Sequence, residues 1–137
     1  MNFKLFTTIP FFTMLAACGG GSTGNNSYAA LGAAALTQTD RYENAELTTI
    51  QDMPTGTFSY SGVAALEGPE GSDDLPILAS IDLNANFSAS SLTGSMSNFV
   101  SGNRDDDSFF SGSIPLNGAI SGNEFTASGS GNLFDPE

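Results

Sequence analysis

The chain has 137 residues, which allows at most one small domain, and its three Lys and Arg face fifteen Asp and Glu. It contains no His and a single Cys, so it has no intramolecular disulfide, no Ser-His-Asp or Cys-His catalytic system and no His-containing zinc or haem site of the usual kinds. We therefore expect a protein that is not an enzyme and needs no cofactor.

The first seventeen residues have the layout of a secretory signal. Lys4 supplies a positive charge, and residues 5–15 form an apolar run that is too short to span a bilayer permanently. Leu15-Ala16-Ala17-Cys18 resembles the lipobox of bacterial lipoproteins, in which the peptide is cut before the cysteine and the thiol carries lipid. The resemblance predicts a signal peptide at 1–17 and lipidation of Cys18. The alternative is an ordinary export signal with an incidental cysteine.

The expected lipid predicts a location at a membrane. Each buried methylene contributes about 0.8 kcal/mol, so two or three lipid chains hold a protein at a membrane permanently. In bacterial lipoproteins an Asp directly after the cysteine tends to retain the protein at the inner membrane, whereas Gly19 stands here. We therefore expect the bacterial outer membrane, facing the periplasm or the cell surface. Removal of Lys4 with the signal leaves a net charge of about −13, which argues against nucleic acid as a partner.

Residues 18–53 are predicted to be a lipidated tether. Gly, Ser, Thr and Asn dominate 19–26, a composition that cannot bury enough apolar surface to order itself, and an Ala-rich stretch at 28–36 could form a short, marginal helix. A formal G-x-S-x-G at 20–24 has no strand before it and no helix after it, so we interpret it as a chance match. The structured domain is expected at 54–137.

The rest of the chain has the period-2 alternation of β-strands. Candidate strands lie at 57–63, 77–87, 92–100, 109–120 and 124–134. In the clearest strand, 77–87, every second residue is apolar and is expected on one face: Ile77, Ala79, Ile81, Leu83, Ala85 and Phe87. Short, regularly spaced strands predict an all-β fold, a small antiparallel meander that forms a partial or complete β-barrel. A low-complexity polar segment is the alternative, against which the 77–87 alternation argues.

Glycines flanked by Ser, Thr or Asn recur along this region. A glycine inside a strand weakens the strand unless another backbone passes closely or the sheet bends. The pattern therefore predicts strongly curved strands. The glycines concerned are Gly56, Gly94, Gly112, Gly122 and Gly129.

Four stretches of this region carry a family resemblance: 53–64, 83–87 followed by 92–95, 120–125 and 131–136. They resemble the β-barrel domain of transferrin-binding protein B and its lipoprotein relatives. In that family a lipobox, a glycine-rich tether and a small eight-stranded barrel follow in this order, which implies a ligand-binding surface lipoprotein. No part of this sequence resembles the family's handle domain, so the resemblance implies the fold and the anchor but not the binding of transferrin. Five strands are too few to close such a barrel, so we expect a truncated product, a half-barrel with an open edge, or a module whose edge pairs with another chain.

Three consecutive carboxylates, Asp105, Asp106 and Asp107, lie in an expected loop. Carboxylate oxygens bind calcium, but neither the EF-hand spacing nor a calcium β-roll repeat is present. A paired-carboxylate glycosidase has no supporting motif. We interpret the three residues as solvated turn residues.

Two functions remain after these exclusions. The first is a non-catalytic surface lipoprotein that binds a protein, haem or metal-carrier ligand, with the loops at 67–74 and 103–108 as the first places for recognition. The second is a structural or assembly lipoprotein that pairs with another chain through an open sheet edge.

Overall fold

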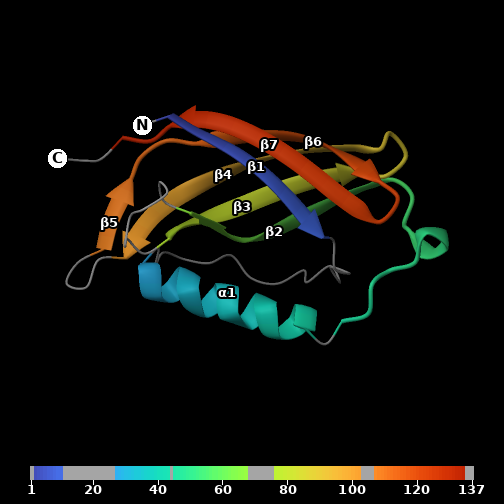
Figure 1. The fold of residues 1–137 in the computed structure, drawn as a ribbon, viewed down its shortest axis with the longest axis horizontal. Helices are drawn as coiled ribbons and strands as arrows, with labels where there is room; N and C mark the ends of the chain where they lie inside the picture. Colours follow the sequence, from blue (N-terminus) through green and yellow to red (C-terminus); the bar gives the residue numbers. More distant parts are fainter. Residues whose placement is uncertain (1, 11–26, 44, 68–75, 103–106, 135–137) are drawn as a thin grey trace.

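The computed structural model describes residues 2–10, 27–43, 45–67, 76–102 and 107–134 (Figure 1). One α-helix accompanies seven strands and a single short 3-10 turn within these ranges. The elements are β1 (Asn2–Pro10), α1 (Tyr28–Glu43), η1 (Ile50–Asp52), β2 (Thr57–Leu66), β3 (Ile77–Asn86), β4 (Ser91–Gly102), β5 (Asp107–Phe110), β6 (Ile114–Ser121) and β7 (Glu124–Asn132).

The strands form one antiparallel sheet in the order β1-β7-β6-β4-β3-β2, and β5 pairs with the end of β4. Strands β2, β3, β4, β6 and β7 follow each other as a meander, which confirms the predicted all-β class. No ladder in the described ranges joins β1 to β2, so the sheet is an open, partial barrel. The expected strand at 109–120 is divided into β5 and β6.

Two elements differ from the expectations. The helix predicted near 28–36 continues to Glu43, and α1 lies against the sheet beside β2 and β3 (Figure 1). Residues 2–10, for which no strand was expected, form β1 and pair with β7. An element within the expected signal and an element within the expected tether therefore both contact the sheet.

A β-bulge in β4 changes the partner of that strand. The pairing of β3 with β4 shifts between Leu78 and Ser80, so that Asn98 and Phe99 together lie opposite Ala79. Asn98 has a φ of 54°, a left-handed conformation that Asn tolerates better than most residues. Before the bulge β4 pairs with β6, and after it β4 pairs with β5. The bulge thus allows one strand to pair with two others on the same side.

Only two of the five glycines that were expected to curve the strands lie inside strands. A Cβ on Gly94 would meet the backbone carbonyl of Asp82, and a Cβ on Gly129 would meet that of Pro115, so these two strand positions require a residue without a side chain. Gly56, Gly112 and Gly122 instead have positive φ angles and lie outside the strands. They serve the turns.

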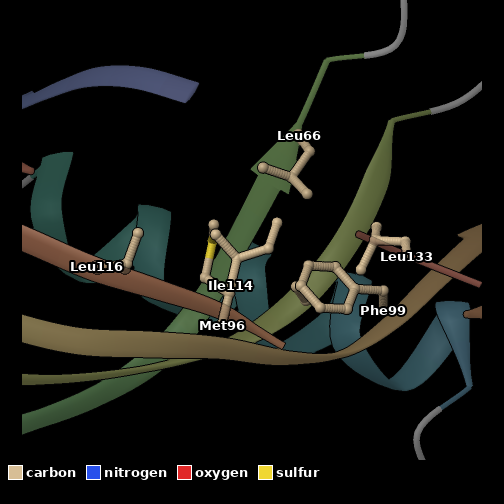
Figure 2. Packing of buried hydrophobic residues seen from close by; sticks show 7 residues of the cluster. Leu66, Met96, Phe99, Ile114, Leu116 and Leu133 are labelled. Atoms are coloured by element: carbon tan, nitrogen blue, oxygen red, sulfur yellow. The ribbon is translucent and has the colours of Figure 1, made fainter. Parts of the chain in front are cut away.

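The interior of the curved sheet holds the main apolar core (Figure 2). Met96, Phe99 and Ile114 are no more than 1% exposed and lie at its centre. The buried members are Leu66, Ala79, Met96, Phe99, Ile114, Leu116 and Leu133. A second buried cluster contains Ala85, Leu92, Ile120 and Phe125. All six apolar residues of the 77–87 alternation belong to these two clusters or pack against them, which confirms that they share one face.

Candidate functional site

The structure describes only some of the residues that the sequence singled out. Cys18, Asp105, Asp106 and the G-x-S-x-G at 20–24 lie outside the described residues. Of the loop at 67–74, only Glu67 is described, and its side chain is exposed. In the described part of the chain no helix is long and apolar enough to cross a membrane.

Asp107, the third acidic residue, lies at the start of β5. Its Oδ2 atom accepts a hydrogen bond from the backbone N–H of Tyr28, the first residue of α1, at 3.0 Å. The first N–H groups of a helix have no partner within the helix and carry partial positive charge, so a carboxylate stabilises this end. Asp107 therefore joins α1 to β5. Within the described ranges, no cluster of three or more His, Cys, Asp or Glu could hold a metal ion.

The helix contacts the outer edge of β2 at one position, whereas most of 57–61 is exposed to solvent. The backbone N–H of Val63 in β2 donates to Oε1 of Gln38 in α1 over 3.3 Å, so a side chain satisfies a group that faces away from β3. Leu31 of α1 is 9% exposed and packs with Leu78 and Val100 on the outer face of the sheet. This third apolar cluster fixes the helix beside the edge strand.

The outer edge of β7 is defined by the hairpin that joins β7 to β6. Ser121 pairs with Glu124 across the two-residue turn Gly122-Asn123, and Gly122 has a φ of 62°, as the first position of a type II′ turn requires. The pair that flanks a two-residue turn exchanges both hydrogen bonds, so the even-numbered residues from Glu124 onward bond to β6. The N–H and C=O groups of the odd-numbered residues from Phe125 onward therefore face away from β6.

Strand β1 occupies this edge (Figure 1). The register runs from Asn2 opposite Asn132 to Pro10 opposite Glu124 without a shift, so all nine residues of β1 are paired. The odd-numbered positions of β7 also face the interior, because Phe125 is 3% exposed and Ala127 packs against the same cluster. The β7 edge is thus a site for an extended strand that continues the sheet beside residues whose side chains face the interior.

A row of aromatic rings crosses the interior face near this site. The Phe58 and Phe87 rings meet edge to face with centroids 5.8 Å apart, and Phe87 lies 5.8 Å from Phe125 of β7. Phe58 is 40% exposed, so the row is buried at β7 and open to solvent at β2. Tyr60 lies beside it, and partial burial raises the pKa of its phenol.

No protein-family model, curated protein or solved structure matches this chain. The resemblance to the transferrin-binding protein B family therefore stays a prediction. Sequence reasoning predicted an open sheet edge but missed β1, because it assigned residues 2–10 to a signal alone, and so it did not identify β7 as the edge that binds a strand. The available signal was the mixture of aromatic and β-branched residues in Asn2–Pro10, a composition that suits a strand as well as an export segment.

Proposed function

We propose that this chain is a lipid-anchored, non-catalytic protein of the bacterial outer membrane that binds a partner with its open β-sheet. The observation that carries the proposal is the position of β1. This strand covers the β7 edge, and all of it lies before Cys18, within the segment that lipobox processing would remove. Processing at Cys18 would leave β7 as a bare edge, and bare edges pair with other chains.

The same observation favours one of the expected ligand classes. A protein, a haem or a metal carrier each suits a surface lipoprotein, but only a polypeptide can continue the hydrogen-bond ladder of a strand. A protein partner is therefore the first choice. The edge also supports a second function, that of an assembly lipoprotein held permanently in a larger complex. The two functions differ in dissociation: a ligand exchanges on dilution, whereas an assembly partner purifies with the chain.

Lipidation is tested by expressing the full chain in a Gram-negative bacterium with labelled palmitate and measuring its intact mass. We expect a labelled product that begins at Cys18. The variant Cys18→Ser should be unlabelled and keep its first seventeen residues. The double variant Cys18→Ser/Ser22→Cys keeps a cysteine four positions further on, and it should also be unlabelled, since the lipobox places the thiol directly after Ala17. An unlabelled wild-type chain that begins at Met1 contradicts the proposal.

The location is tested on the same cells. We expect the wild-type chain in the outer-membrane fraction and Cys18→Ser in the inner-membrane or soluble fraction. Protease added to intact cells then distinguishes the two faces of the outer membrane, because only a chain at the cell surface is digested before the cells are broken. A wild-type chain that fractionates with Cys18→Ser is inconsistent with a lipid anchor.

A further inference from the structure

We infer that the β7 edge of the processed protein binds an extended segment of another protein, about nine residues long, with apolar residues at alternate positions and no net negative charge. The inference rests on the proposed function, because β1 must leave before the edge is free. It goes beyond that function by stating which chemistry the partner has and which backbone groups hold it.

The backbone of β7 determines how the partner is held. The odd-numbered residues from Phe125 to Gly131 direct their N–H and C=O groups to the outer edge, as the hairpin register requires. In the ladder with β1 these residues pair with Ile9, Thr7, Leu5 and Phe3. Hydrogen bonds from such alternate residues supply affinity that depends little on sequence. An incoming strand must therefore offer unblocked amides at every second position.

The interior face of β7 determines which side chains the partner needs. Phe125 and Ala127 present side chains to the second core cluster, whereas Gly129 and Gly131 further along the strand present none. A strand laid beside these glycines adds apolar cover to the interior only if its own alternate residues are large and apolar. The register of β1 places Leu5 opposite Gly129 and Phe3 opposite Gly131, in agreement with this requirement.

Charge and composition favour a different protein over a second copy of this chain. The processed chain carries a net charge of about −13, so two copies repel each other, whereas a neutral or basic segment does not. The segment that β7 holds in the structure contains Lys4 and no acidic residue.

The experiment uses the full chain with a protease site inserted between residues 11 and 17 and cleaved after folding. A fluorescent peptide with the sequence of residues 2–10 is added, and its anisotropy is followed. N-methyl groups on Leu5 and Thr7 block amides that face β7, and they should weaken binding at least tenfold. The matched peptide, N-methylated on Phe6 and Thr8, blocks only amides on the opposite side and should bind within threefold of the parent.

The side-chain requirement is tested with two further peptides. Replacement of Phe3 and Leu5 by Ser should weaken binding at least tenfold, because the register pairs both residues with glycines that supply no side chain of their own. Replacement of Lys4 and Phe6 by Ser should change affinity less than threefold. Uncut protein should not bind the parent peptide, because β1 remains covalently attached at the edge.

Three outcomes overturn the inference. The first is equal affinity of the two N-methylated peptides, and the second is no binding of the parent peptide to the cut protein. The third is a concentration-dependent dimer of the cut protein in sedimentation experiments that excludes the peptide, which would identify a second copy as the occupant. Because cleavage at the inserted site does not need Cys18, these results are independent of whether the chain is lipidated.

Discussion

The two edges of the sheet are covered in different ways. At β2 the contact is with α1, which follows Cys18 in the chain, and Gln38 satisfies the edge amide of Val63 there. At β7 the contact is with β1, a backbone ladder that precedes Cys18 and would be lost if the chain were processed as proposed. Exposed edges invite uncontrolled pairing, and proteins cover those that they do not use. The difference is that a side chain satisfies one edge amide at β2, whereas a whole strand is paired along β7, and under the proposed processing at Cys18 only the helix would stay attached.

The largest expected effect comes from a substitution that forces β7 away from β6. A Cβ on Gly118 of β6 would meet the carbonyl of Thr126 and lie 2.8 Å from the Cα of Ala127. Gly118→Val should therefore destabilise the fold by about 3 kcal/mol in urea unfolding followed by far-UV circular dichroism. Ala119→Val on the same strand is the matched control, because Ala119 is exposed and a strand accepts a β-branched residue there, and it should cost less than about 1 kcal/mol. Equal losses would mean that β6 and β7 do not approach closely.

The next effect tests the packing of α1 on the sheet beside β2. Leu31→Ala removes a buried contact with Leu78 and Val100 and should destabilise the protein by about 2 kcal/mol. Leu36→Ala on the same helix removes a side chain that is 69% exposed and should change stability by less than about 0.5 kcal/mol. Hydrogen exchange should accelerate at the Val63 amide, whose hydrogen bond Gln38 of the helix accepts, in Leu31→Ala only. No difference between the two variants would show that α1 does not hold this edge.

A smaller effect is expected at the first turn of α1. Asp107→Ala removes the acceptor for the Tyr28 amide and should cost about 1 kcal/mol, whereas Asp107→Asn keeps an acceptor and should cost less. Asp82→Asn on an exposed position of β3 is a control for charge alone. If all three variants have the same stability, the contact between α1 and β5 contributes nothing measurable.

The single hydrogen bond at the β2 edge gives a local signal. Gln38→Ala should cost about 0.5–1 kcal/mol and accelerate hydrogen exchange at the Val63 amide, because that group loses its acceptor. Gln51→Ala, at an exposed position, should leave this amide unchanged. If the Val63 amide exchanged at the same rate in Gln38→Ala, its protection would come from the packing of α1 and not from this hydrogen bond.

The smallest expected effect is a change in stability at alkaline pH. It concerns Tyr60, whose side chain lies on the interior face of β2. Burial raises the pKa of Tyr60 above 10.0, so the folded state favours the protonated phenol. This contribution to stability is complete below pH 10.0 and is lost as the pH rises through the folded pKa. Tyr60→Phe should lose less stability than the wild type between neutral and strongly alkaline pH in thermal melts. If the wild type and Tyr60→Phe lost the same stability as the pH rises, the Tyr60 phenol would be exposed to water.

Local sequence patterns predicted the strands of the meander, but they did not predict the docking of α1 or the presence of β1. The alternation at 77–87 identifies β3 because strand periodicity depends on neighbouring residues alone. The docking of α1 depends on contacts of Leu31 with Leu78 and Val100, which are far away in the chain. The sequence of the segment by itself therefore predicted only a short, marginal helix. The role of Asp107 was hidden for the same reason, because Tyr28 lies 79 residues away. The strand β1 was missed because its residues also match an export signal.

The junction between Asp107 and Tyr28 determines how the domain would stand on a bilayer. In a chain acylated at Cys18, the nine residues from Gly19 to Ser27 extend at most about 30 Å before α1 begins beside β5. The loops at 67–74 and 103–108 leave the sheet at this same end, since Leu66 pairs with Ile77 and Gly102 with Asp107. In such a chain the tether would hold this end of the sheet near the lipid headgroups. The turn between β6 and β7 lies at the opposite end of the sheet and would face away from the bilayer.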